Sequence, residues 1–96
     1  MLVVSEKFKI DRGKEKVILD DIPKWRKLDE KFGCKWIGCF MTYIGRTYEF
    51  EILYEIPDLA TFQTMIEKTP EMLPNEFKKF TEFTSDFTVQ ILKLIH

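Results

Sequence analysis

Two strand-like runs, residues 36–44 and 47–54, constrain the fold of this chain more than any other feature. Both runs are rich in β-branched and aromatic residues, and they flank the dipeptide Gly45-Arg46. A Gly-X pair is typical of a type II′ hairpin turn, because the first central residue of that turn needs a positive φ. The sequence therefore predicts a β-hairpin closed by a two-residue turn at Gly45-Arg46.

The register of this hairpin predicts two unlike faces. One face is entirely apolar or aromatic and holds Ile37, Cys39, Met41, Tyr43, Tyr48, Phe50, Ile52 and Tyr54. The other face mixes Trp36, Phe40, Thr42 and Leu53 with Glu49, Glu51 and Glu55. This second face is too apolar for a solvated surface and too charged for a core. We therefore expect the first face to hold helices and the second to meet a partner, with a dimer interface at Trp36, Phe40 and Leu53.

Length, composition and charge bound the class of protein. At 96 residues and 45% hydrophobic content, the chain is expected to form one domain, residues 1–96, with its own core. The net charge of -1 gives no reason to expect nucleic-acid binding, which needs a surplus of Lys and Arg. No apolar run approaches the ~20 residues of a membrane span, and the first residues do not resemble a signal peptide. The expected location is the cytoplasm, with no membrane partner.

The order of the remaining elements predicts the fold class. Residues 3–10 alternate as a strand, and apolar spacing over 14–32 predicts a helix interrupted at Pro23. After the hairpin we expect a helix from Asp58 to Thr69-Pro70, a helix opened by Pro74 and a last strand over 86–95. The order βαββα(α)β is that of an α+β, ferredoxin-like βαββαβ sandwich with a four-stranded antiparallel sheet.

That topology also predicts contacts between the first and third strands. Because these strands are neighbours and antiparallel, Lys7 and Lys9 are expected on the same sheet face as Glu49 and Glu51. The sequence therefore predicts a cross-strand ion pair between one of these lysines and one of these glutamates.

The cysteines and the histidine exclude several kinds of site. Cys34 and Cys39 are not spaced as a CxxC motif, and the single histidine is His96. We therefore expect no metal site and no cofactor, and a Ser-His-Asp or Cys-His catalytic arrangement is unlikely on the same ground.

Short motifs along nearly the whole chain resemble a known family. The motifs are Gly13-Lys14, Gly33, Ile37-Gly38, Thr42, Ile44-Gly45, Glu49 and Leu53-Tyr54-Glu55. They resemble the NIPSNAP-like group of dimeric α+β barrel proteins. The resemblance implies a homodimer whose two sheets face one another, with helices outside and a small-molecule cavity between the sheet and helices of each subunit.

The chain departs from that group at positions that bear on function. Members often carry an Arg and a Tyr after the glutamate of strand one and a His in strand three, where this chain has Phe8, Ile10 and Ile52. The wider superfamily includes haem-binding proteins, cofactor-free monooxygenases and lactone isomerases. Haem binding is not expected here, because the chain has no internal histidine ligand.

Glu6 is the sharpest candidate for chemistry, because it is the one carboxylate predicted on the helix-facing side of the sheet. A buried carboxylate has a raised pKa and can act as a general acid or base. The alternative is that Glu6 lies near a strand end and reaches solvent or a lysine. The predicted ligand site comprises Glu6, Cys39, Met41, Tyr43, Tyr48 and Tyr54.

Two classes of function remain open. The first is a small homodimeric module that binds a small apolar or aromatic ligand or another protein. The second is a cofactor-free enzyme, of monooxygenase or isomerase type, that acts on an aromatic or polyketide-like substrate. A closed aromatic cavity containing Glu6 favours the enzyme, whereas a cavity filled by Trp25, Phe77 and Phe80 favours the binding module.

Overall fold

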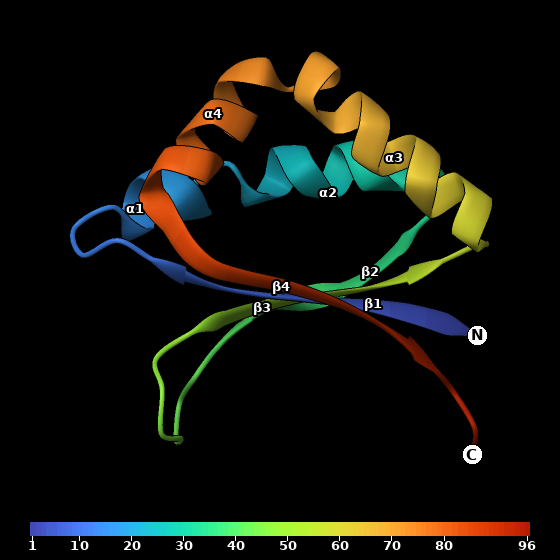
Figure 1. Cartoon of the computed structure of the whole chain (residues 1–96), viewed down its shortest axis with the longest axis horizontal. Coiled ribbons are helices and arrows are strands. Elements are labelled where there is room, and N and C mark those ends of the chain that lie inside the picture. Colours follow the sequence, from blue (N-terminus) through green and yellow to red (C-terminus); the bar gives the residue numbers. More distant parts are fainter.

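A computed structural model describes residues 1–96 as four strands and four helices. The elements are β1 (Leu2–Ile10), α1 (Glu15–Leu19), α2 (Ile22–Lys31), β2 (Lys35–Met41), β3 (Phe50–Ile56), α3 (Leu59–Met72), α4 (Pro74–Phe83) and β4 (Thr84–Lys93). The strands form one antiparallel sheet in the order β2-β3-β1-β4. All four helices lie on one face of the sheet (Figure 1). The predicted α+β, ferredoxin-like class and element order are confirmed.

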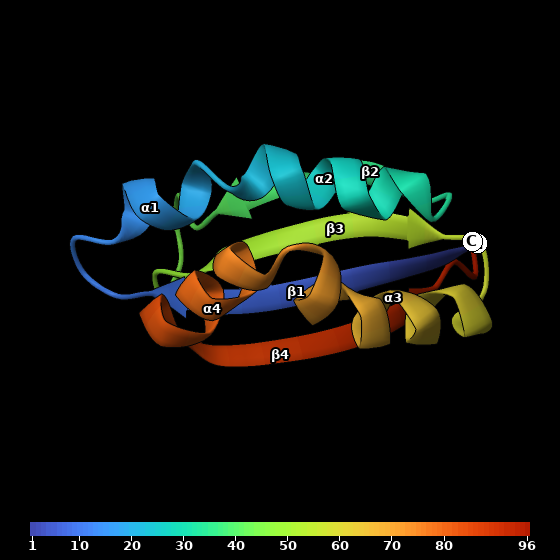
Figure 2. The ribbon, with the colours of Figure 1, turned by 90° about the horizontal axis from the view of Figure 1, so that it is seen from above.

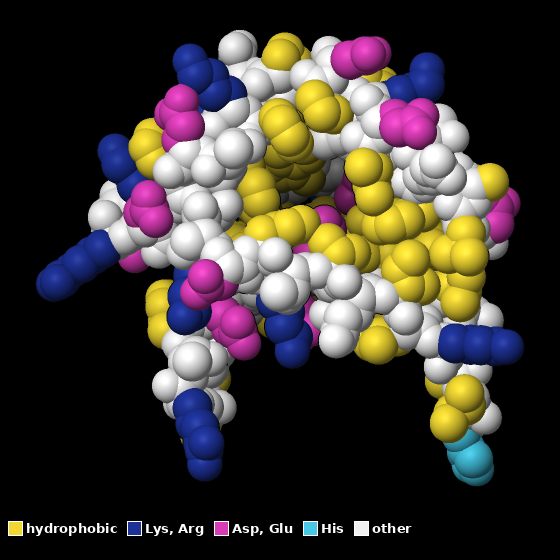
Figure 3. Space-filling model, in the orientation of Figure 1, with side chains coloured by type: hydrophobic (Ala, Val, Ile, Leu, Met, Phe, Trp, Pro, Cys, Tyr) yellow, Lys and Arg dark blue, Asp and Glu magenta, His cyan; other side chains and the backbone are white.

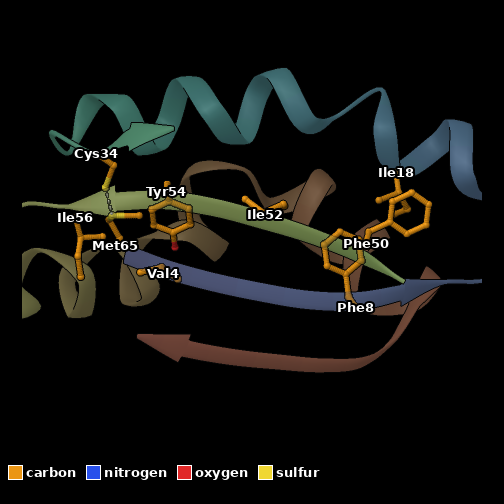
Figure 4. Packing of buried hydrophobic residues seen from close by; sticks show 9 residues of the cluster. All are labelled: Val4, Phe8, Ile18, Cys34, Phe50, Ile52, Tyr54, Ile56 and Met65. Carbon is orange, nitrogen blue, oxygen red and sulfur yellow. Dashed lines mark hydrogen bonds between the residues drawn. The ribbon is translucent and has the colours of Figure 1, made fainter. Parts of the chain in front are cut away.

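The core lies between the helices and the inner face of the sheet. Alternation along β1 points Val4 and Phe8 inward, and both are fully buried. The rings of Phe8 and Phe50 stack with their centroids 5.9 Å apart. Nine buried residues from strands β1 and β3 and the surrounding segments form this cluster (Figure 4): Val4, Phe8, Ile18, Cys34, Phe50, Ile52, Tyr54, Ile56 and Met65.

The helix boundaries follow from proline and capping chemistry, with one correction. The interruption predicted at Pro23 separates α1 from α2, and the Asp58 side chain accepts a hydrogen bond of 2.7 Å from the Thr61 amide at the start of α3. The predicted end at Thr69-Pro70 was wrong, because α3 continues to Met72 with Pro70 inside it. Pro70 removes one backbone donor, and the carbonyl that loses its partner belongs to Ile66, which is exposed to solvent.

The predicted two-residue turn was wrong. β2 ends at Met41 and β3 begins at Phe50, so a loop of residues 42–49 joins them, and Gly45 does not have a positive φ. The last pairing is between Thr42 and Glu49, whose backbone groups are joined by a 2.9 Å hydrogen bond. Beyond that pair the loop side chains have no core to pack against, so the two strands do not continue their hydrogen-bonded pairing to the turn. The inner register is nevertheless as predicted, with Met41 opposite Phe50 and Cys39 opposite Ile52.

A β-bulge in β2 corrects the predicted face of Trp36. The register shifts between Trp36 and Gly38, so Ile37 is the extra residue and Trp36 lies opposite Tyr54. The indole therefore turns to the helix side of the sheet, where it stacks on Tyr54 with centroids 6.2 Å apart and planes 9° apart. Trp36 does not lie on the face assigned to the dimer interface, whereas Phe40 and Leu53 do.

The predicted ion pair between strands one and three does not form, although its register is right. Lys7 lies opposite Glu51, but Glu51 accepts a 2.6 Å hydrogen bond from the Ser5 hydroxyl. Lys9 instead pairs with Asp86 at 3.1 Å. Asp86 reaches it because the pairing of β1 with β4 is irregular there, and Asp86 adopts a φ of 53°.

β4 forms one edge of the sheet (Figure 2). Its inward-facing Val89 and Ile91 remain 41% and 38% exposed, so the helices do not close over this edge. None of the helices has the length and apolar character needed to cross a lipid bilayer.

Candidate functional site

A pocket opens between the sheet and the helices, and we call it the sheet–helix pocket. Its volume is about 130 Å³. Figure 3 shows a hollow between the upper helices and β4, with hydrophobic side chains around it and acidic atoms inside. Its lining is mostly apolar and aromatic, with two carboxylates: Glu6, Trp25, Asp29, Trp36, Ile52, Tyr54, Met65, Ile66, Thr69, Phe77, Phe80 and Phe87.

Three polar side chains meet in this pocket from three elements. The period-two alternation of β1 turns Glu6 inward between Val4 and Phe8. Tyr54 comes from the neighbouring β3, and its hydroxyl extends toward β1 (Figure 4). Asp29 comes from α2 and is held by Trp36, whose indole N–H donates a 2.8 Å hydrogen bond to Asp29 Oδ2.

Burial shifts the pKa values of these groups. The pKa of Glu6 rises to about 7, because the pocket desolvates it and the Asp29 charge is near, while Tyr54 acts in the opposite direction. The pKa of Asp29 rises to about 6 through burial, opposed by the hydrogen bond from Trp36. The pKa of the Tyr54 hydroxyl is also raised, chiefly by burial and then by Glu6. Two carboxyl groups that change charge near neutral pH therefore share one pocket.

Aromatic rings form the walls of the pocket rather than filling it. Phe80 makes edge contacts with Trp25 and Phe87, at centroid distances of 6.4 and 5.6 Å. Trp25, Phe77 and Phe80 all line the remaining space. The cavity is aromatic and contains Glu6, but its mouth is open. It is therefore neither the closed cavity expected of an enzyme nor the filled cavity expected of a binding module.

The structure brings together two of the six predicted ligand residues. Glu6 and Tyr54 line the pocket, whereas Cys39 packs against the core and does not reach it. Met41, Tyr43 and Tyr48 are 56%, 91% and 55% exposed, so their predicted place in the pocket was wrong. These side chains are exposed because the end of the hairpin projects away from the helices (Figure 1).

Sequence reasoning missed Asp29, although a signal was present. Positions 22, 25, 29 and 32 share one face of an α-helix, so Asp29 belongs to the same face as Ile22, Trp25 and Phe32. An acidic residue on an apolar helix face is a candidate for a buried site. Trp36 was missed for another reason, because the bulge that turns it inward leaves no trace in simple alternation.

The cysteines and acidic groups do not suggest a metal centre. No group of three or more His, Cys, Asp and Glu side chains is placed to hold a metal ion. Cys34 is buried beside Met65, with the two sulfurs 3.3 Å apart. Burial raises the pKa of the Cys34 thiol to about 11, so it is a poor nucleophile at neutral pH.

The opposite side of the sheet, which we call the outer face, has no helix over it. Its apolar members are Val3, Phe40, Leu53 and Leu92. Phe40 and Leu92 are 48% and 47% exposed. The 42–49 loop and the C-terminal segment both project past this face (Figure 1), and they carry further exposed apolar side chains: Tyr43, Ile44, Leu94 and Ile95.

Comparison with solved structures identifies the fold. An uncharacterized NIPSNAP domain protein from Burkholderia xenovorans is 13% identical with a TM-score of 0.78, over 99% of this chain and 95% of that chain. A NIPSNAP family protein from Agrobacterium tumefaciens is 16% identical with a TM-score of 0.77, over 97% and 92%. An antibiotic biosynthesis monooxygenase is 22% identical with a TM-score of 0.69, over the full length of both chains. The chain therefore has the fold of NIPSNAP proteins and of this monooxygenase, while no family model and no curated protein matches it.

Proposed function

We propose that this protein is a small homodimeric domain that binds a small apolar or aromatic molecule in the sheet–helix pocket. The observation that carries the proposal is Glu6, a half-buried carboxyl without an ion-pair partner that faces a pocket with aromatic walls. Placing a carboxyl group in such surroundings costs free energy of folding, as its raised pKa indicates. A bound molecule that contacts the carboxyl offsets this cost.

The size of the pocket limits the ligand. Its volume of about 130 Å³ is close to the ~150 Å³ of an apolar protein cavity that holds one benzene molecule. Pockets for drug-sized ligands are larger, at roughly 300–1,000 Å³. The ligand we propose therefore has one ring, and a fused polyketide would extend out of the mouth of the pocket.

The interface of the proposed homodimer is the outer face of the sheet. Val3 and Leu92 are cross-strand neighbours there, and Phe40 and Leu53 extend the same apolar surface toward β2. A second copy of the sheet offers an identical surface, as a two-fold symmetric interface requires. The two projecting segments, 42–49 and 94–96, would contact the sides of that second copy.

Tryptophan signals test ligand binding directly. The chain has two tryptophans, Trp25 and Trp36, and both line the pocket, so their indole N–H resonances report on it. We expect one-ring aromatic fragments to shift both resonances in a saturable titration. Ile66→Phe narrows the mouth and should weaken the response, whereas Ile44→Phe, in the distant loop, should not. Unchanged indole signals across a varied fragment set would refute the proposal.

A cofactor-free enzyme is the second candidate, and one observation favours it. Glu6 has a pKa of about 7, and a general acid or base works best when its pKa is near the operating pH. Glu6 would move a proton at an activated carbon of a one-ring substrate, with Tyr54 as hydrogen-bond donor. Deuterium exchange into arylacetone-type fragments, followed by proton NMR, tests this activity. Glu6→Gln should abolish exchange while the fragments still shift the indole signals, and equal exchange with the variant would exclude Glu6 as the base.

A further inference from the structure

The charges around the sheet–helix pocket are one-sided. Its lining includes the two carboxyl groups of Glu6 and Asp29 and contains no lysine, arginine or histidine. The lysines next to Trp25 and Phe80 in the sequence are already paired: Lys79 lies 2.7 Å from Asp21, and Lys24 lies 3.1 Å from Glu76. The pocket therefore has acidic groups without a basic partner.

The walls of the pocket suit the same kind of ligand. Six aromatic residues line the space, and they are Trp25, Trp36, Tyr54, Phe77, Phe80 and Phe87. Aromatic faces attract cations through their quadrupole, and tryptophan does so most strongly. A carboxyl group inside an aromatic enclosure favours a cation on two independent grounds, whereas an anion meets repulsion and a neutral molecule leaves the carboxyl groups unpaired.

We propose that the pocket selects a cationic amine, namely a single ring or compact apolar body that carries an ammonium group. This inference rests on the proposed function and deepens it by naming the class of ligand. The ammonium group lies against the Glu6 carboxylate, and Asp29 supplies the second negative charge. The Asp29 oxygen that accepts from Trp36 stays engaged, so the tryptophan holds the carboxylate in place for the ligand.

Binding of such a ligand depends on pH through a small set of groups. The titratable groups in the lining are Glu6, Asp29 and Tyr54. From outside the lining, Glu30 raises the pKa of Asp29 and Cys34 raises the pKa of Tyr54. The lining residues from α3, α4 and β4 carry no titratable group. With a Glu6 pKa of about 7, its ionised fraction falls from about 0.9 at pH 8 to about 0.03 at pH 5.5. Affinity for the amine is therefore expected to fall by up to about tenfold through Glu6 over this range, the same limit as the loss expected of Glu6→Gln.

Three probes of matched size test the inference: 2-phenylethylamine, 2-phenylethanol and phenylacetate. At pH 8 the first is a cation, the second is neutral and the third is an anion. We expect the indole resonances of Trp25 and Trp36 to report binding of the amine at least about tenfold tighter than that of the alcohol, with phenylacetate weakest.

Two variants assign the selectivity to the carboxyl groups. Glu6→Gln keeps the shape of the side chain and should weaken amine binding about tenfold, while binding of the alcohol changes less than about twofold. Asp29→Asn, which keeps an acceptor for Trp36, should weaken amine binding in the same direction. Equal affinity for amine and alcohol, or an unchanged amine affinity in both variants, would overturn the inference and leave the proposed function standing. Absence of any indole response, to these probes and to the fragment set alike, would overturn both.

Discussion

Replacing Glu6 with glutamine should stabilise the protein at alkaline pH and leave it unchanged at acidic pH. The folded protein holds the Glu6 proton more tightly than the unfolded chain, because its pKa rises from 4.5 to about 7. The contribution of Glu6 to the stability of the wild type is therefore greatest below pH 4.5 and is lost as the pH rises through 7, where the carboxyl group must ionise inside the pocket. Glutamine is neutral throughout and removes this loss.

The magnitude follows from the shift in pKa. Each pKa unit corresponds to about 1.36 kcal/mol, so the full shift corresponds to about 3 kcal/mol. Glu6 is half-buried in an open pocket, and solvent reduces the effect to about 2 kcal/mol. For a domain of this size, such a change moves the melting temperature by roughly 8–16 °C.

Urea unfolding at pH 4 and pH 8, at one fixed protein concentration, measures both limits. We expect the two proteins to agree at pH 4 and the variant to be more stable at pH 8. Glu71→Gln is the matched control, since this exposed glutamate makes no ion pair, and its effect should stay within about 0.5 kcal/mol at both pH values. A variant less stable than the wild type at pH 8 would show instead that Glu6 is ionised and stabilised by a partner in the folded protein.

Two further predictions concern the outer face and the support of Asp29. Phe40→Asp should dissociate the proposed dimer, because it places an unpaired charge in the interface, and light scattering should show a monomer while Ile66→Asp remains dimeric. A wild-type protein that is monomeric at tens of micromolar would contradict the dimer. Trp36→Phe should cost about 1–3 kcal/mol in urea unfolding, because Asp29 loses its 2.8 Å donor inside the protein. The Trp25 indole makes no hydrogen bond within the protein, so Trp25→Phe should lower the free energy of unfolding by less. An equal loss in both variants would mean that the smaller ring, and not the lost hydrogen bond, causes the effect.

The fold was predictable because local patterns agree with the final packing. The alternation of β1 placed Val4, Glu6 and Phe8 inward, and Pro23 marked the boundary between two helices. The irregular positions were not predictable from alternation or turn composition. The bulge at Ile37 and the loop at 42–49 depend on where the helices stop covering the hairpin, which is a tertiary property.

The candidate site was predictable in part for the same reason. Glu6 followed from one strand, but Tyr43 and Tyr48 were assigned to the pocket on the assumption that the helices cover the hairpin to its tip. Both are exposed on the projecting 42–49 loop instead. Asp29 required the apolar face of α2 to be widened to include position 29, and Trp36 required the bulge.

A crystal structure of the protein with 2-phenylethylamine at pH 8 would show directly whether the amine occupies the sheet–helix pocket. We expect one ring between Trp25 and Trp36, with the ammonium nitrogen at roughly 2.7–3.0 Å from a Glu6 carboxylate oxygen. A pocket closed by Phe77 and Phe80, with Glu6 turned into solvent and no ligand between sheet and helices, would contradict it.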